Sequence, residues 1–157
     1  MCFARFSGDT SCFRAPGQFV HIELQDCFLR RPFSVCDWGE NWFDIVYKVI
    51  GRGTDILSRI KPGEKLDILT GLGNGFDICV DSENPLLAGG GAGIAPLYGL
   101  AKRLVKKETT AVLGFNSAAD AFFVKEFEKL GCKVLISTAD GGLGIHGLVT
   151  DIIKKLR

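Results

Sequence analysis

The spacing of hydrophobic residues changes half-way along the chain. In the first half, short apolar runs alternate with polar residues, which is typical of strands with one buried face. The expected strands span residues 18–24, 33–37, 42–50 and 64–69, and a short helix over 55–60 precedes the last of them. Residues 1–14 are hard to assign, although 2–6 fit a short strand. This pattern predicts a small antiparallel β-barrel that is incomplete.

In the second half, strands and amphipathic helices alternate. The pattern predicts a strand from Leu86, a helix over 94–107, a strand over 109–115, a helix over 118–130, a strand over 133–138 and a helix over 148–156. Residues 111–113 and 134–136 are continuously apolar, as expected of strands covered by helices on both faces. Such alternation predicts a parallel, doubly wound α/β sheet. A polar stretch at 81–85 divides the chain into expected domains 1–83 and 84–157.

A glycine cluster joins the first strand of the second half to its helix. Gly91, Gly93 and Pro96 stand in the order G-x-G-x-x-P. Glycines at such a turn let backbone N–H groups and a helix N-terminus approach a pyrophosphate, since no Cβ blocks the way. Proline is tolerated in a first helical turn because its missing N–H is not needed there. The alternative is a glycine turn that only packs the helix tightly on the sheet.

Two stretches of the first half could also bind phosphate. Arg31, Pro32, Phe33 and Ser34 present a guanidinium fork, an aromatic face and a small hydroxyl from consecutive strand positions. Gly53 and Thr54 stand at the start of the predicted short helix, where unpaired N–H groups favour an anion. The alternative for residues 31–34 is an ordinary strand start with exposed arginines.

Composition narrows the possible classes of protein. A net charge of +1 provides no electrostatic footprint for nucleic acid or an anionic membrane. No apolar run approaches the roughly 20 residues of a membrane-spanning helix, and the first residues lack a signal-peptide pattern, so we expect a cytoplasmic protein. The six cysteines are too widely spaced for a zinc or iron–sulfur motif. We therefore expect free thiols and no metal site.

The motifs together, in their order and spacing, resemble the ferredoxin reductase-type flavoproteins. Within that family the chain is most similar to the electron-transfer subunits of NAD-dependent dihydroorotate dehydrogenase, over about residues 16–156. The matching pieces are RPFS at 31–34, VYK at 46–48, GT at 53–54, GLGNGF at 71–76, the glycine cluster, STADGG at 137–142 and GLVTD at 147–151.

The resemblance implies bound FAD and NAD(H). It implies that Arg31 pairs with FAD phosphate, that Phe33 borders the isoalloxazine ring and that Ser34 hydrogen-bonds near N5. Val46, Tyr47 and Lys48 would hold the ribityl and pyrophosphate region, Gly53 and Thr54 would cap the FAD pyrophosphate, and Gly91, Gly93 and Pro96 would bind the NAD pyrophosphate. Tyr47 and Lys48 could instead belong to a solvent-facing strand. The family's hydride step needs no acid or base, so no catalytic side chain is expected.

Other polar residues fit less specific roles. The acidic residue expected about 20 positions after the glycine turn is missing, and the strand over 109–115 is followed by Asn116 and Ser117. No arginine stands there to receive a 2′-phosphate, which weakly favours NADH over NADPH. Asp140 fits a nucleotide contact or a turn equally well. His21 and His146 are expected to be structural or exposed.

The chain departs from the family at both ends, so we expect a truncated product. The family has more barrel strands before residue 16, and its dihydroorotate members carry a cysteine-rich [2Fe–2S] segment whose ligands are absent here. The expected function is electron transfer, through FAD, between NAD and a catalytic, FMN-containing dihydroorotate dehydrogenase subunit in pyrimidine biosynthesis. Alternatives are the FAD subunit of a sulfide dehydrogenase or ferredoxin:NADP oxidoreductase, and a non-catalytic nucleotide-binding remnant.

Overall fold

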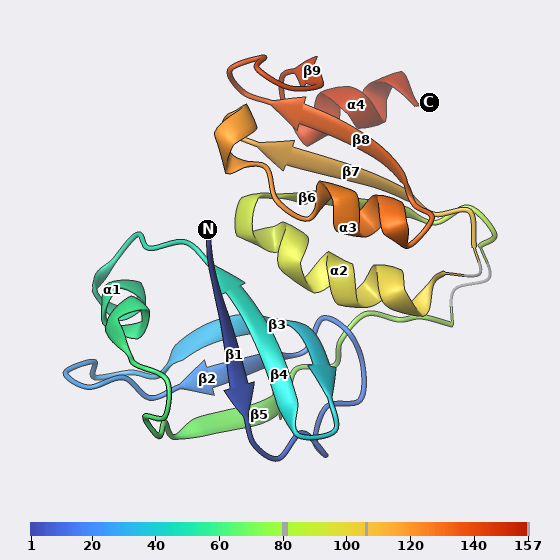
Figure 1. The fold of residues 1–157 in the computed structure, drawn as a ribbon. Coiled ribbons are helices and arrows are strands. Elements are labelled where there is room, and N and C mark those ends of the chain that lie inside the picture. Colours follow the sequence, from blue (N-terminus) through green and yellow to red (C-terminus); the bar gives the residue numbers. More distant parts are fainter. Residues whose placement is uncertain (80–81, 106, 157) are drawn as a thin grey trace. The chain divides into compact units, whose positions relative to one another are not determined.

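A computed structural model describes residues 1–79, 82–105 and 107–156. The chain forms two compact units, residues 1–76 and 77–157, and each is described by itself (Figure 1). The sequence placed the second domain's start at 84. Two residues within the ranges predicted from the sequence lie outside the described residues: Asp81 in the polar stretch and Lys106 in the predicted helix 94–107.

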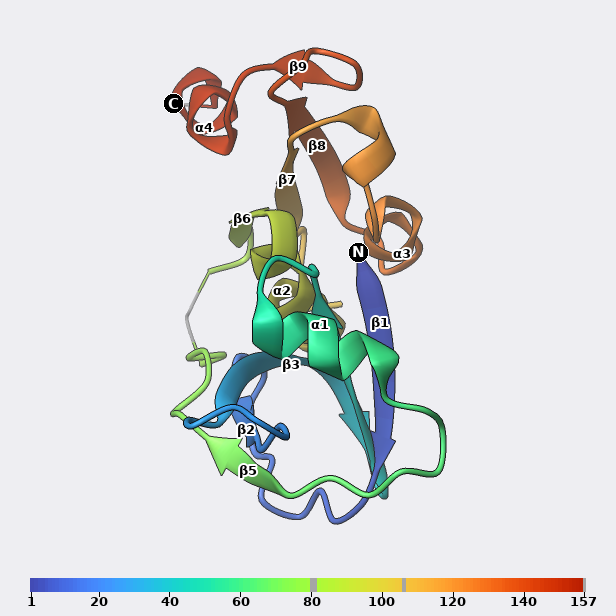
Figure 2. The same ribbon diagram turned by 90° about the vertical axis from the view of Figure 1, so that its left-hand side faces the viewer.

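The first unit is a five-stranded antiparallel sheet with one helix (Figures 1 and 2). Its strands run in the order β1-β4-β3-β2-β5. They are β1 (Cys2–Ser7), β2 (Phe19–Ile22), β3 (Arg31–Gly39), β4 (Trp42–Tyr47) and β5 (Ile68–Leu72), and the helix is α1 (Arg52–Arg59). Val20, Ile22, Val35 and Ile45 are almost fully buried in its core. The sheet confirms the predicted antiparallel unit, but β5 begins four residues later than the predicted strand 64–69.

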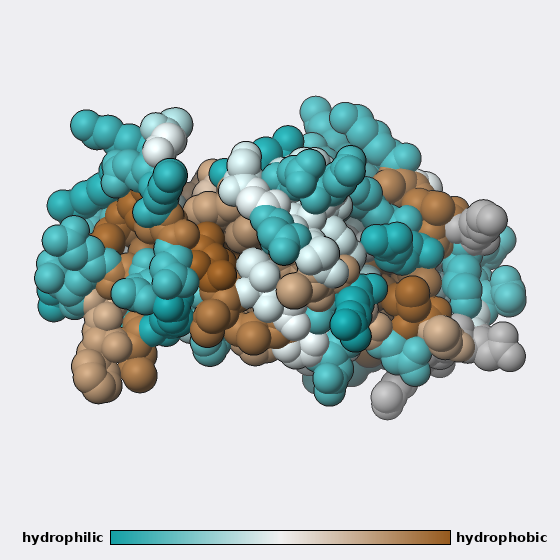
Figure 3. Space-filling view, turned by 90° about the horizontal axis from the view of Figure 1, so that it is seen from below, coloured by the Kyte–Doolittle hydropathy of each residue, from teal (hydrophilic) through white to brown (hydrophobic). Residues whose placement is uncertain are grey.

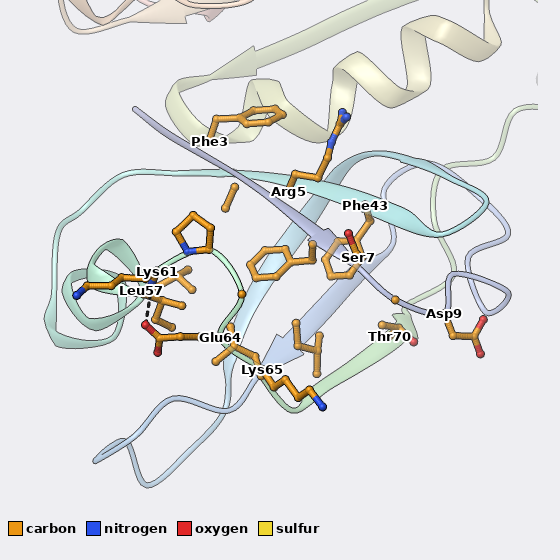
Figure 4. Close-up of a pocket in the computed structure, with 18 residues that line it drawn as sticks. Phe3, Arg5, Ser7, Asp9, Phe43, Leu57, Lys61, Glu64, Lys65 and Thr70 are labelled. Atoms are coloured by element: carbon orange, nitrogen blue, oxygen red, sulfur yellow. Dashed lines mark hydrogen bonds between the residues drawn. The ribbon is translucent and has the colours of Figure 1, made fainter.

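The two edge strands of this sheet do not pair with each other within the described part of the chain. β1 pairs only with β4, and β5 only with β2. A groove of about 980 Å³ lies along β1 and the segment 60–70 (Figure 4). Cys2, Ala4 and Phe6 stay only half-buried at this edge. The sheet is therefore curved but not closed, as the incomplete barrel predicted.

Large apolar side chains also reach the surface of the first unit. Phe28 is 99% exposed and Leu29 62% exposed in the loop between β2 and β3. The space-filling view from below shows apolar areas among the polar surface (Figure 3).

The second unit is a four-stranded parallel sheet in the order β6-β7-β8-β9. Its elements are β6 (Leu86–Gly90), α2 (Ile94–Arg103), β7 (Thr110–Phe115), α3 (Val124–Lys129), β8 (Lys133–Thr138), β9 (Ile145–His146) and α4 (Val149–Lys155), with 3₁₀ turns over Gly91–Gly93 and Ala118–Asp120. A Cβ on Gly89 would meet Leu97 of α2, and one on Gly114, in the next row of the sheet, would meet Val149 of α4. Helices therefore cover both faces, which confirms the doubly wound α/β unit.

Two helices, α2 and α3, are shorter in the structure than the sequence predicted. The predicted helix 118–130 is wrong in its first half, because the Ser117 hydroxyl bonds Asp120 at 3.0 Å in a separate 3₁₀ turn. Phe123 then takes a left-handed φ of 61°, and its ring packs 4.9 Å from that of Tyr98. The predicted helix 94–107 ends at Arg103.

Candidate functional site

Arg31 meets the start of α1. A Cβ on Gly53 would lie 2.9 Å from Cγ and Nε of Arg31, so the arginine stem lies directly against the glycine backbone. No hydrogen bond or ion pair engages the Arg31 guanidinium within the described residues. A guanidinium that no described residue engages thus stands beside the N-terminal turn of a helix. This combination of fixed charge and unpaired N–H groups suits a phosphate.

Thr54 closes the turn that leads into α1. Its Oγ1 accepts hydrogen bonds from the N–H groups of Ile50 (3.1 Å) and Gly51 (3.2 Å) and donates one to the Gly51 carbonyl (2.9 Å). The hydroxyl is therefore used within its own turn. Thr54 shapes the helix start, and a direct contact with a phosphate stays a prediction.

The other residues of the RPFS motif divide between the two faces of β3. Phe33 is 8% exposed, and its ring packs edge-to-face on Tyr47 with centroids 5.7 Å apart. Pro32 and Ser34 are exposed on the opposite face, because side chains alternate along a strand. The structure therefore brings Phe33 and Tyr47 together and separates them from Ser34.

Tyr47 and its neighbours end β4. Val46 and Tyr47 are buried, whereas Lys48 follows the strand and is exposed. Burial raises the pKa of Tyr47, and the Cys2 thiol opposite it on β1 adds to the shift. The phenol therefore keeps its proton at neutral pH and can act as a hydrogen-bond donor.

The glycine turn of the second unit is open toward solvent. No atom lies within 4 Å of a Cβ built on Gly91 or Gly93, both of which are exposed, and Gly91 has a φ of 52°. Pro96 stands in the first turn of the ten-residue helix α2. The tight helix packing that the sequence offered as an alternative exists two residues earlier, on β6, where a Cβ on Gly89 would lie 2.6 Å from Leu97. Packing thus explains Gly89 but not Gly91 or Gly93.

The remaining polar candidates have structural partners. Oδ1 of Asp140 accepts a hydrogen bond from the Gly142 N–H at 2.9 Å, so this carboxylate forms a turn. His21 packs its ring 5.4 Å from that of Phe19, and His146 is exposed. Within residues 1–79, 82–105 and 107–156, no group of three or more His, Cys, Asp or Glu side chains could hold a metal ion. None of the helices described is long and apolar enough to cross a membrane.

Comparisons with known proteins agree with this arrangement. No family model matches the chain. The electron transfer subunit of dihydroorotate dehydrogenase B (NAD(+)) from Fusobacterium nucleatum is 44% identical over 153 residues, and that of a Geobacillus strain is 45% identical over 150 residues. These matches cover 92% and 90% of this chain. By sequence, the chain is a relative of these electron transfer subunits. It spans 59% and 58% of their lengths.

Solved structures share its fold. The structure of an NADH-dependent reduced ferredoxin-NADP oxidoreductase superposes with a TM-score of 0.84 at 37% identity, covering 98% of this chain and 58% of that one. The ferredoxin reductase of carbazole 1,9a-dioxygenase superposes with a TM-score of 0.83 at 21% identity, covering 98% and 51%. The chain therefore has the fold of ferredoxin reductase-type FAD and NAD-binding domains.

Proposed function

We propose that this chain binds FAD on its first unit and NAD(H) on its second, and passes electrons between NAD and a partner dehydrogenase. The contact of Arg31 with Gly53 carries the proposal. Two phosphate-binding candidates that are 22 positions apart in the sequence lie side by side, and no hydrogen bond or ion pair to another described residue engages the guanidinium. The similarity to dihydroorotate dehydrogenase B electron transfer subunits supports it.

The described residues fit the two cofactors. Arg31 would pair with an FAD phosphate, the N–H groups at the start of α1 would receive its oxygens, and Phe33 and Tyr47 would lie beside its apolar parts. When bound, FAD supplies the exchange between a two-electron hydride and single electrons. In the second unit, the space over Gly91 and Gly93 would admit the NAD pyrophosphate, which a Cβ at either position would obstruct.

The proposed partner is the catalytic, FMN-containing dihydroorotate dehydrogenase subunit. In a longer relative, a [2Fe–2S] cluster would connect the two flavins. A second candidate is the FAD subunit of an NADH-dependent reductase that serves ferredoxin and NADP. The 37% identity to such an oxidoreductase favours it.

A titration of the full chain with FAD tests the first site, with quenching of flavin fluorescence as the measure of binding. Arg31→Gln should weaken FAD binding tenfold or more, since a hydrogen bond to a charged group contributes about 1.5–3 kcal/mol. Arg59→Gln is the control, because Arg59 lies at the other end of α1 and pairs with Asp55. Absence of FAD binding by the unsubstituted chain would identify a remnant, and equal affinity in the Arg31 variant would overturn the site.

Binding of NADH tests the second site separately. Gly93→Ala should weaken NADH binding and leave the melting temperature unchanged, because the added methyl group meets no protein atom. Gly8→Ala, at another exposed glycine with open space around it, should change neither quantity. Unchanged NADH affinity in the Gly93 variant would place the dinucleotide elsewhere.

A further inference from the structure

Two consecutive arginines precede the RPFS proline, and the structure gives them opposite surroundings. Nη1 of Arg30 donates to the carbonyl and to Oδ1 of Asp67 at 3.0 and 2.9 Å, and its Nη2 donates to Oε2 of Glu23 at 2.6 Å. The Arg30 side chain is only 24% exposed. Arg31, the next residue, lies against Gly53 and has no such partner within the described residues.

Strand register explains the difference. Ile22 of β2 pairs with Arg31 on one side and with Ile68 of β5 on the other. Because Ile22 is fully buried, this row of side chains faces the core and α1. The next row lies one residue beyond these strand ends, with Arg30 just before β3, Glu23 just after β2 and Asp67 just before β5. It faces outward, since side chains alternate along each strand.

The outward row extends the pairing of β2 and β5 by one residue, at the C-terminal end of β2. The Glu23 N–H donates to the Asp67 carbonyl at 2.9 Å, and Arg30 reaches across β2 to bond that same carbonyl. Arg30, just before β3, thus bonds Asp67, just before β5, as well as Glu23 between them. Its contact also lowers the pKa of Asp67, so this carboxylate is ionised at neutral pH.

A shift of one residue in the pairing of β3 would exchange the two arginines. The two arginines by themselves do not oppose this shift, since both carry the same fork and stand side by side. Phe33 and Val35 do oppose it, because the shift would turn these buried side chains outward. Glu23 and Asp67 discriminate between them, because they lie on the outward face only. With two carboxylates bound to it, Arg30 offers little to a phosphate.

We propose that Glu23 and Asp67, by binding Arg30, hold the first residues of β3 in register and thereby present Arg31 alone to the FAD phosphate. Arg30 is on this account a positioning residue for FAD binding. The proposal rests on the proposed FAD site and names the residues outside it that determine its geometry.

The double variant Glu23→Gln with Asp67→Asn tests the proposal, because a role in register and a role in charge alone predict changes of opposite sign in FAD affinity. If the two carboxylates acted only through their charge, their removal would make the unit more positive and FAD would bind more tightly. If they fix the register, FAD binding should weaken about threefold to tenfold. Glu40→Gln, which removes an exposed carboxylate elsewhere on the same unit, should not weaken FAD binding.

A double-mutant cycle between the arginines shows whether Arg30 acts through Arg31. Arg30→Gln should weaken FAD binding threefold or more in the otherwise unchanged chain, and should have no effect when Arg31→Gln is already present. Arg30→Lys, which keeps the charge but not the fork, should recover part of the affinity. Circular dichroism and melting temperature are measured on every variant, and Asp67→Asn alone replaces the carboxylate pair if the double variant does not fold.

The outcomes separate this proposal from the proposed function. If the unsubstituted chain binds no FAD, the proposed function fails. If it binds FAD and loss of the carboxylates leaves affinity unchanged or raised, the register proposal is overturned while the FAD site stands. An equal loss from Arg30→Gln in both backgrounds would also overturn it, since Arg30 would then contact FAD independently.

Discussion

Replacement of Gly53 by alanine should separate stability from cofactor binding. Gly53 lies in the first turn of α1 with a φ outside the left-handed region, so its backbone accepts alanine. Alanine in a helix is more stable than glycine by about 0.5–1 kcal/mol. The free energy of unfolding should therefore stay constant or rise slightly.

The same methyl group displaces Arg31. Cγ and Nε of Arg31 lie 2.9 Å from the built Cβ, while ordinary contacts begin at 3.4 Å, so the middle of the arginine side chain must move by about 0.5 Å or more. Because Nε belongs to the guanidinium and Cγ lies on the stem that carries it, the whole fork moves with them. Loss of one charge-assisted hydrogen bond, about 1.5 kcal/mol or more, corresponds to at least a tenfold weaker FAD complex.

Flavin fluorescence titration and thermal unfolding without FAD measure the two effects. Ser58→Ala on the same helix is the matched control, because it raises helix propensity on an exposed face and should leave FAD affinity unchanged. Gly53→Ala should add no further loss to Arg31→Gln. An unaltered FAD affinity in Gly53→Ala, or a full additional loss in the double variant, would refute the reasoning.

Three further predictions concern the second unit. Ser137 is fully buried, and its hydroxyl has no hydrogen-bond partner among the described residues, so Ser137→Ala should leave the free energy of unfolding unchanged or raise it by up to about 1 kcal/mol. Thr138→Val, which removes a bonded hydroxyl, should cost about 1 kcal/mol in the same chemical denaturation. Gly114→Ala would place a Cβ 2.5 Å from Val149 and should destabilise by about 1–3 kcal/mol; stability within 0.5 kcal/mol would show that α4 is not seated on β7 as described. The Leu148 N–H at the start of α4 donates to the Asp151 carboxylate and lowers its pKa below the ordinary 3.8. The stability that this contact contributes is therefore present above pH 3.8 and is lost as the pH falls through the lower pKa of the folded state. Asp151→Asn should flatten this part of the acid unfolding curve, and an unchanged curve would contradict the assignment.

Periodicity predicted both sheet types and most of the order of elements, because burial on one face or two faces leaves a direct trace in sequence, but it missed the two-residue strand β9. It failed between Ala118 and Phe123, where the apolar spacing is helical but a local hydrogen bond and the left-handed Phe123 interrupt the helix. Such features depend on single side chains and on packing against α2, which no spacing reveals.

The candidate site was predictable as a set of motifs but not as a geometry. The sequence indicated Arg31 and Gly53 separately, and only the fold shows their contact. The sequence did not indicate that Arg30, unlike the neighbouring Arg31, is held in ion pairs, since these depend on the placement of Glu23 and Asp67 beside it in the fold. The separation of Phe33 from Ser34 follows from strand alternation and could have been foreseen.

The most direct test is a visible absorption spectrum of the purified chain mixed with FAD and freed of excess, followed by anaerobic addition of NADH. The account predicts retained flavin bands that bleach on NADH, because both units carry their nucleotide sites. Retained bands that persist would contradict the NAD(H) part of the account. A colourless protein would contradict its central claim.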